Sequence, residues 1–243
     1  VRNNVEGTRI IADLAVKYRA KKFVMVSTDK AVNPTNVMGC SKRICEIYVQ
    51  SLDKAVKDGK VEGVTQFVTT RFGNVLGSNG SVIPLFKEQI KQGGPITVTH
   101  PDIIRFFMLI PEACKLVLEA GTMGNGGEIF VFDMGKPVKI VDLARRMIQL
   151  SGAKNVEIKF TGLRDGEKLY EEVLNEEETT KPTFHAKIKI AQVREYDYAD
   201  VCRQVDELVA SSVKEDDMGI VRRMKEMVPE FKSKHSVYEV LDK

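Results

Sequence analysis

The strongest constraint on this chain is a regular alternation of short apolar runs with longer amphipathic segments. The run at 21–27 is apolar and rich in β-branched residues, a helical pattern follows over 37–58, and a second apolar run occupies 64–72. Further helical patterns lie at 82–92, 111–121 and 139–152, and further extended patterns at 128–134 and 156–162. This alternation predicts an α/β domain with a largely parallel sheet.

The chain divides into three regions by pattern. Residues 1–75 open with an amphipathic helix at 4–18 and contain the first two strands, so they form the main sheet domain. Residues 76–196 hold shorter elements with more Gly and Pro, as expected of a smaller lobe interleaved with the last sheet elements. Residues 197–243 read as charged helices and form a helical C-terminal appendage. The apolar stripe of the first helix is predicted to be Val5, Ile11, Leu14, Ala15 and Tyr18.

Composition excludes several classes of function. The net charge is only +3 and the basic residues are spread along the chain, which argues against nucleic-acid binding. The four cysteines form no CxxC pair and have no histidine at metal-ligand spacing, so we expect free thiols and no metal site. No apolar run is long enough to cross a bilayer and no signal peptide opens the chain, so we expect a cytoplasmic location.

A glycine-rich stretch at 73–80 follows a predicted strand and precedes a predicted helix, where a phosphate-binding loop would lie. Its spacing is GxxxGxxG rather than GxGxxG, and no acidic residue closes a second strand about 20 residues later. An ordinary flexible loop or a substrate loop therefore remains open.

The segment at 26–43 carries the most chemistry. Ser27, Thr28, Asp29 and Lys30 follow the first strand, at the carboxyl end where α/β sheets bind ligands. The next helix carries Met38 and Lys42, which are four residues apart and share one face. Here the chain resembles the extended short-chain dehydrogenase/reductases, in which a Ser or Thr after the strand works with a Tyr-x-x-x-Lys pair.

The stretch from Thr28 to Gly39 (TDKAVNPTNVMG) narrows the resemblance. It is similar to the UDP-N-acetylglucosamine 4,6-dehydratases of polysaccharide and glycan biosynthesis. Met38 stands where the family Tyr is expected, which resembles the C5-retaining branch. The resemblance runs from residue 1 to about residue 200, and its other matching stretches are 4–8, 71–78, 100–108 and 163–170.

This resemblance implies the C-terminal part of a Rossmann-like doubly wound parallel sheet, a smaller substrate-binding lobe and a helical tail. Within it, residues 1–75 would be a partial NAD-binding domain, because the strand and Gly-x-x-Gly-x-x-Gly loop that open the family do not precede the first helix. We therefore expect a C-terminal fragment of a homo-oligomeric enzyme. In its full-length form, N-terminal helices would anchor the enzyme at the cytoplasmic face of the inner membrane.

The resemblance also assigns catalytic roles to Thr28, Asp29, Lys30, Met38 and Lys42. Lys30 would remove the C5 proton once C4 is oxidised, and Asp29 would protonate the departing C6 hydroxyl. To act as a base Lys30 must be uncharged, which burial and a neighbouring cation such as Lys42 would favour. A thioether cannot accept the O4 proton, so Asp29 or a water held by Thr28 would replace the family Tyr.

Binding residues follow from the same resemblance. Arg105 and Arg164 would grip the substrate diphosphate with assistance from Lys87, Asn74 would bind a phosphate, and Glu167 would accept from the uridine ribose hydroxyls. The cofactor, with NAD favoured over NADP, would contact Asn4, Ser27, Lys42, Phe72, Asn74 and Val75. Two alternatives stay open: a UDP-sugar 4-epimerase, which uses the Tyr that Met38 replaces, and an inactive nucleotide-sugar-binding relic.

Overall fold

A computed structural model of the chain describes residues 1–172, 174, 179–213 and 216–242. Its main sheet has five strands in the order β1 (Lys22–Val26), β2 (Gln66–Arg71), β7 (Ile129–Phe132), β11 (Ile188–Gln192) and β10 (Thr179–Pro182). The pairs β1–β2 and β2–β7 are parallel, and the β10–β11 hairpin joins β7 antiparallel. The predicted α/β fold is confirmed, and β1, β2 and β7 form the predicted parallel part of the sheet, while the antiparallel hairpin was not predicted.

The predicted helices are all present. The described helices are the π-helix η1 (Arg2–Glu6), the α-helices α1 (Gly7–Lys17), α2 (Val37–Lys57), α3 (Val82–Lys91), α4 (Ile110–Met123), α5 (Ile140–Ser151), α6 (Tyr198–Val213) and α7 (Asp217–Met227), and the 3₁₀ helices η2 (Asp29–Ala31) and η3 (Val237–Leu241). Of these, η2 was not predicted. Three short strand pairs complete the fold: β3 (Asn74–Val75) with β6 (Phe107–Met108), β5 (Ile104–Arg105) with β8 (Val138–Lys139), and β4 (Ile96–Val98) with β9 (Ile158–Phe160).

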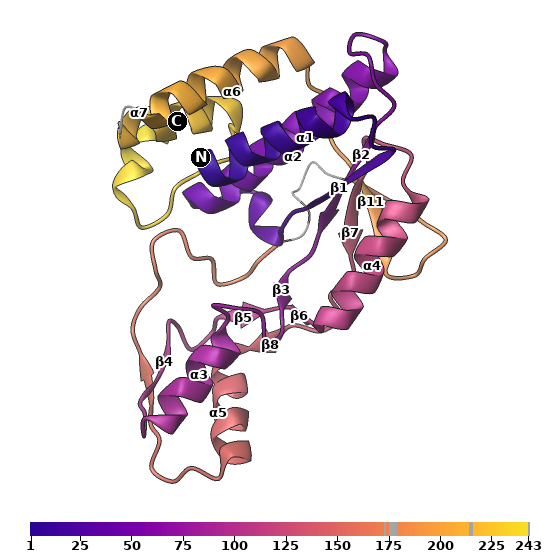
Figure 1. Cartoon of the computed structure of the whole chain (residues 1–243). Coiled ribbons are helices and arrows are strands. Elements are labelled where there is room, and N and C mark those ends of the chain that lie inside the picture. Colours follow the sequence, from indigo (N-terminus) through magenta and orange to yellow (C-terminus); the bar gives the residue numbers. More distant parts are fainter. Residues whose placement is uncertain (173, 175–178, 214–215, 243) are drawn as a thin grey trace.

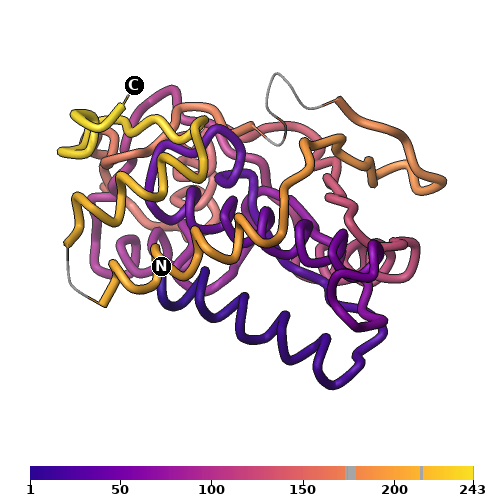
Figure 2. The backbone as a smooth tube through the Cα atoms, turned by 90° about the horizontal axis from the view of Figure 1, so that it is seen from above, coloured from indigo at the N-terminus to yellow at the C-terminus, as the bar shows by residue number. Residues whose placement is uncertain are grey.

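Helix α2 is the centre of the largest hydrophobic core. Asn36 caps its first turn by accepting a hydrogen bond from the Gly39 amide, and Ile44 and Leu52 are buried between the sheet and the C-terminal helices. Val205 and Leu208 of α6 belong to this same core, and burying each such side chain contributes roughly 1.5–3 kcal/mol. Figure 2, seen from above, shows α6 running alongside the N-terminal helix. The C-terminal helices therefore stabilise the sheet domain directly.

The opposite face of the sheet is covered by α4, as Figure 1 shows. Along β2, Phe67 packs in the α2 core while Val68 packs with Leu116 and Ala120 of α4, as the two-residue period of a strand requires. Below the sheet, α3 and α5 form a lobe with β4 and β9 around a separate core that includes Phe86. The segment after β9 enters this core through Leu163 and Leu169.

The predicted apolar stripe of the first helix is wrong in part. Val5 and Ala12 are buried, but Ile11, Leu14 and Tyr18 are exposed. Because α1 lies at the margin of the helical layer, only a narrow strip of its surface meets α2 and β1. The side chains of Ile11, Leu14 and Tyr18 therefore form an exposed apolar face on α1.

Candidate active site

The end of β1 leads into a tight turn that holds a carboxyl group beside an amine. Thr28 caps the short helix η2, where its hydroxyl accepts from the Lys30 amide and donates to Asp29 Oδ1 at 2.9 Å. The Asp29 amide donates to the Phe72 carbonyl, which fixes the turn to the end of β2. Lys30 Nζ lies 2.9 Å from Asp29 Oδ1, and Asp29 is only 1% exposed. The predicted Thr-Asp-Lys group is thus a hydrogen-bonded unit in which Asp29 is buried and Thr28 and Lys30 are half-buried.

Helix α2 begins directly against this turn. A Cβ on Gly39 would lie 2.1 Å from the Lys30 carbonyl oxygen, so only glycine permits this approach. The approach leaves Met38 46% exposed on the first turn of α2, and Lys42 Nζ donates to the Val26 carbonyl at the end of β1 over 3.4 Å. Met38 and Lys42 therefore lie beside the carboxyl end of the sheet, as predicted.

The structure corrects the neighbour that was expected for the Lys30 ammonium. Lys42 was expected to help keep Lys30 uncharged, but the Lys42 ammonium is directed to the β1 carbonyl. Lys30 instead donates to Asn74 Oδ1 at 3.1 Å and lies 4.0 Å from Glu171 Oε1, in addition to its Asp29 contact. The groups next to the Lys30 ammonium are therefore an amide oxygen and two carboxyl groups rather than a second cation.

The Arg105 side chain is more buried than we expect of a side chain that binds the substrate diphosphate. Its Nη1 donates to the carbonyls of Ile104 and Leu169, and its Nη2 lies 3.4 Å from Glu167 Oε1 and 3.7 Å from Glu171 Oε1. The side chain is only 8% exposed. A diphosphate would therefore have to displace Nη2 from two carboxylates before Arg105 could grip it.

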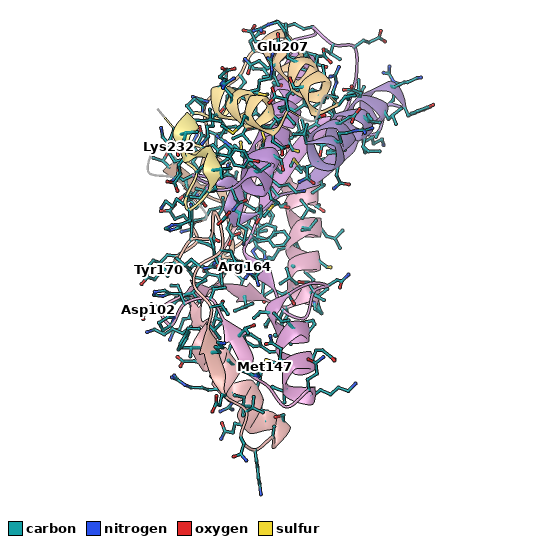
Figure 3. All side chains as sticks on the ribbon, turned by 90° about the vertical axis from the view of Figure 1, so that its left-hand side faces the viewer. Asp102, Met147, Arg164, Tyr170, Glu207 and Lys232 are labelled. Atoms are coloured by element: carbon teal, nitrogen blue, oxygen red, sulfur yellow. The ribbon has the colours of Figure 1, made fainter. Side chains whose placement is uncertain are left out.

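The segment at 163–172 places Arg164 and Tyr170 between the C-terminal helices and the lower lobe (Figure 3). Gly166 has a φ of +69° and packs so closely on Thr35 and Asn36 that a Cβ would lie 2.5 Å from the Asn36 Cβ. Arg164 is exposed, while its amide donates to Glu167 Oε2 at 3.1 Å.

A cavity of about 730 Å³ opens beside this segment. Its lining includes Glu167, Lys168, Tyr170, Lys232, Lys234 and His235. Its volume lies within the usual range for small-molecule sites. Lys232 to His235 follow the C-terminal helices, so this tail forms one wall of the cavity.

The side chains of several other predicted residues make their contacts outside the Thr28–Lys30 turn. The Asn4 amide donates to Ser41 on α2, and the Ser27 hydroxyl is buried and donates to Glu46 at 2.7 Å. Lys87 is exposed on α3, where no contact to that turn is found among the described residues. Phe72 stacks on Phe132 with ring centroids 5.4 Å apart, and Val75 pairs with Met108.

A buried ion network beneath the site was not predicted. Glu46 on α2 accepts from Arg71 Nε at 2.8 Å and Nη2 at 2.6 Å, from Arg43 at 2.9 Å, and from Ser27. Burial alone would raise the pKa of Glu46, but the Arg71 guanidinium, with Arg43 and Ser27, lowers it to about 2. Because Ser27 precedes the Thr28 turn and Arg71 precedes the Asn74 loop, the network joins both halves of the site.

Glu171 is the second residue that sequence reasoning missed. Burial raises the pKa of its carboxyl group, the charges of Lys30, Arg105 and Lys168 oppose this, and the Asp29 carboxyl adds to it. The one sequence signal was its position directly after the matching stretch that ends at Tyr170.

Comparison with known proteins gives the family. A family described as polysaccharide biosynthesis protein matches residues 1–193. The chain belongs to this family. It is 52% identical over 225 residues to the capsular polysaccharide biosynthesis protein CapD of Staphylococcus aureus, which is 92% of this chain and 37% of that protein. It is 41% identical over 182 residues to a UDP-glucose 4-epimerase of Rickettsia rickettsii, covering 74% of this chain and 51% of that protein. The chain therefore spans well under two thirds of each relative.

Solved structures agree with the fold. Pen from Bacillus thuringiensis superimposes with a TM-score of 0.71 at 36% identity, over 77% of this chain and 58% of that chain. A dTDP-glucose 4,6-dehydratase from Bacillus anthracis, solved in complex with NAD, gives 0.57 at 20% identity over 67% of this chain and 56% of that one. Among the described residues, no helix is both long enough and apolar enough to cross a membrane.

Proposed function

We propose that this chain is the catalytic portion of an NAD-dependent 4,6-dehydratase that acts on UDP-N-acetylglucosamine. Its product would be a UDP-4-keto-6-deoxy-amino sugar for capsule, O-antigen or other glycan synthesis. Family membership and the relation to CapD support a role in polysaccharide synthesis. The observation that carries the specific reaction is the ion pair between the buried Asp29 and the half-buried Lys30, at the turn that leads to the exposed Met38.

This pair offers the two proton transfers that dehydration needs. Elimination across C5 and C6 requires a base at C5 and an acid at the departing C6 hydroxyl. Lys30 supplies an amine and Asp29 a carboxyl group within one turn. Asp29 Oδ2 is buried and has no hydrogen-bond partner among the described residues, which costs roughly 1–3 kcal/mol for a polar group. A substrate hydroxyl that donates to this oxygen would remove that cost.

The residues around the end of β1 fit the nicotinamide half of the cofactor. Lys42 lies beside the β1 carbonyl end and can donate to ribose hydroxyls, while Met38 leaves an exposed apolar surface one helical turn before it. When bound, NAD⁺ would supply the hydride acceptor for C4 and the hydride donor for C6. For the substrate, we place the diphosphate at the exposed Arg164 and the uridine in the adjoining cavity lined by Glu167. Glu167 already accepts three contacts, but a carboxylate can accept about four hydrogen bonds, so one ribose hydroxyl can still bind.

The reaction is tested in a chain extended N-terminally to the length of its relatives. With UDP-N-acetylglucosamine in deuterated water, we expect a 4-keto-6-deoxy product that carries deuterium at C5. Lys30→Met should stop deuterium incorporation yet allow reduced nicotinamide to accumulate, visible by absorbance, because C4 oxidation precedes proton removal. Near-normal product formation by Lys30→Met would remove Lys30 as the base.

A UDP-sugar 4-epimerase is the second candidate, favoured by the relation to the Rickettsia protein. Epimerisation needs neither loss of the C6 hydroxyl nor proton removal at C5. A C4 epimer without C5 deuterium would therefore establish the epimerase. Met38 counts against it, because a thioether cannot exchange a proton with the C4 hydroxyl.

A further inference from the structure

The residues that follow α7 are held against the candidate site. After α7 the chain continues without helix or strand until η3, and such terminal segments are usually poorly ordered unless specific contacts hold them. Here the Lys232 amide donates to the Pro34 carbonyl at 3.1 Å, and the Lys234 carbonyl accepts from the Gly166 amide at 2.7 Å. The tail segment, residues 232–235, is therefore hydrogen-bonded to the loop before α2 and to the segment that follows β9.

A buried lysine on α7 holds the same segment from its other side. The Lys225 side chain is only 9% exposed, and its Nζ donates to the Ser233 hydroxyl at 2.8 Å and to the Phe231 carbonyl at 3.3 Å. It also pairs with the Asp242 carboxylate, which accepts from the Ser233 amide at 3.2 Å. Burying an ammonium is costly unless it is paired and hydrogen-bonded, and these contacts meet that need. Lys225 thus fixes the backbone of the tail segment.

The tail segment ends in a backbone conformation that is unusual for a residue with a side chain. His235 has a φ of +55°, in the left-handed region. This conformation is unfavourable for a residue with a Cβ, and it is found preferentially where a ligand site requires it. Lys234 and His235 both line the cavity of about 730 Å³ described above. The tail segment is therefore a fixed wall of that cavity.

The charges that line the cavity leave one cation over. Each carboxylate in the described lining faces a cation, since Glu230 faces Arg43, Glu172 faces Lys168 and Glu167 faces Arg105. Lys234 is exposed, and within the described parts of the chain its ammonium has no hydrogen bond or ion pair. The cavity wall therefore presents an uncompensated positive charge at Lys234, which suits an anionic group of a ligand.

The backbone contact of Lys234 places this charge beside the proposed nucleotide. Gly166 lies in the chain between Arg164, where we place the diphosphate, and Glu167, where we place the uridine ribose. Because the Gly166 amide donates to the Lys234 carbonyl, Lys234 adjoins the point where ribose and diphosphate meet. An ammonium has three donors and no acceptor, and it binds phosphate oxygens as a point charge.

We propose that Lys234 binds the diphosphate of the nucleotide together with Arg164, so that the tail segment forms part of the nucleotide site. Lys225 is the positioning residue that holds the tail segment for this contact. The two cations come from different parts of the chain, so the diphosphate would lie between the segment after β9 and the tail segment. This role rests on the nucleotide placement proposed above, and it is independent of which reaction follows binding.

Calorimetry of UDP binding to this chain tests the contact. Lys234→Gln keeps the length of the side chain and removes its charge, so UDP affinity should fall about tenfold at low salt. The loss should shrink as salt is raised, because ions screen an exposed charge. Uridine, measured by competition, should bind both chains equally because it has no phosphate. Lys234→Arg should retain most of the UDP affinity, and Lys115→Gln on the exposed face of α4 is the matched control.

A double-mutant cycle tests the positioning role of Lys225. Lys225→Met should lower UDP affinity as much as Lys234→Gln does, and the variant with both changes should lose no more, because both changes remove one contact. A general loss of structure would instead add to the effect of Lys234→Gln. If circular dichroism shows that Lys225→Met does not fold, Asp242→Asn, which weakens the same contact, takes its place in the cycle.

The outcomes separate this proposal from the dehydratase function. Unchanged UDP affinity in Lys234→Gln, or an equal loss of uridine and UDP affinity, would overturn the role of Lys234 and leave the dehydratase intact. Additive losses in the cycle would overturn the role of Lys225. If the unmodified chain does not bind UDP, the nucleotide placement fails together with this proposal, whereas deuterium incorporation at C5 still decides the reaction.

Discussion

Removal of the Glu46 carboxylate should destabilise the chain more than any exposed charge change. Glu46 is fully buried and accepts hydrogen bonds from Arg71 on β2, from Arg43 on α2 and from Ser27 directly after β1. Glu46→Gln keeps the shape but removes the anion that the buried Arg71 and Arg43 guanidinium groups share, while Arg43 keeps its contact with Glu230 at 3.2 Å. Breaking one side of a buried ion pair typically costs about 3–5 kcal/mol.

The pH dependence gives an independent magnitude. The pKa of Glu46 falls from 4.5 to about 2 on folding, and each unit is worth about 1.36 kcal/mol, so the ionised carboxylate contributes on the order of 3 kcal/mol. Because the folded pKa is lowered, this stability is fully present above the unfolded pKa. It is lost as pH falls from about 5 toward about 2. The difference between unmodified chain and variant should therefore shrink on acidification.

Urea denaturation followed by circular dichroism, at pH 7 and at steps down to about pH 3, measures both effects. The matched control is Glu119→Gln on the exposed face of α4, which should stay within about 0.5 kcal/mol of the unmodified chain. A Glu46→Gln variant equally close to the unmodified chain at pH 7 would refute the network as a source of stability. A large loss that does not change with pH would refute its electrostatic origin.

Two further predictions concern the entry to α2 and the substrate clamp. Gly39→Ala places a Cβ 2.1 Å from the Lys30 carbonyl oxygen, so the free energy of unfolding from urea denaturation should fall by at least about 2 kcal/mol. The control is Gly7→Ala, which should be neutral or stabilising because its Cβ would lie 3.8 Å from the nearest atom. An unchanged Gly39→Ala stability would contradict the close approach. Arg164→Lys replaces a planar fork by a point charge, so UDP affinity by calorimetry should fall about tenfold, or 1.4 kcal/mol. A change under about twofold would remove Arg164 from the diphosphate site, and Arg145→Lys on α5 serves as the control.

The sequence predicted those helices and strands whose own residues show a helical period or an apolar run. The 3.6-residue period located α2, α3 and α5, and the apolar runs located β1, β2 and β7, because each buries a face that its own sequence defines. The two-residue strands such as β3 and β5 carry no such signal. They exist because tertiary contacts bring their backbones together.

The candidate site divides in the same way. Asp29, Lys30, Met38 and Lys42 lie within one strand–helix unit, so their proximity follows from the chain connection alone. Ser27 was expected to face the cofactor, but its hydroxyl points toward α2 and donates a hydrogen bond to Glu46. Sequence position alone therefore does not show whether a hydroxyl such as that of Ser27 faces the ligand or a buried acceptor such as Glu46.

Glu171 could not be predicted because its contacts depend on how the lobe meets the sheet. Lys30 comes from the end of β1, Arg105 from β5, and Glu171 from the segment after β9. No periodic pattern joins such segments. A pair of adjacent glutamates after Tyr170 reads as solvated surface until the burial of one of them is known.

The two buried ion clusters contain the same kinds of groups and yet suit different tasks. Around Glu46, two guanidinium groups share one carboxylate, and because a guanidinium does not release its proton in proteins, the charges there are permanent. Around Lys30, two carboxyls face one ammonium, and an ammonium can lose a proton. Ion pairs whose charges do not change are suited to holding β2 against α2. An arrangement with one transferable proton and two acceptors suits acid–base chemistry, which is why the turn after β1 is the part of this fold where we place the reaction.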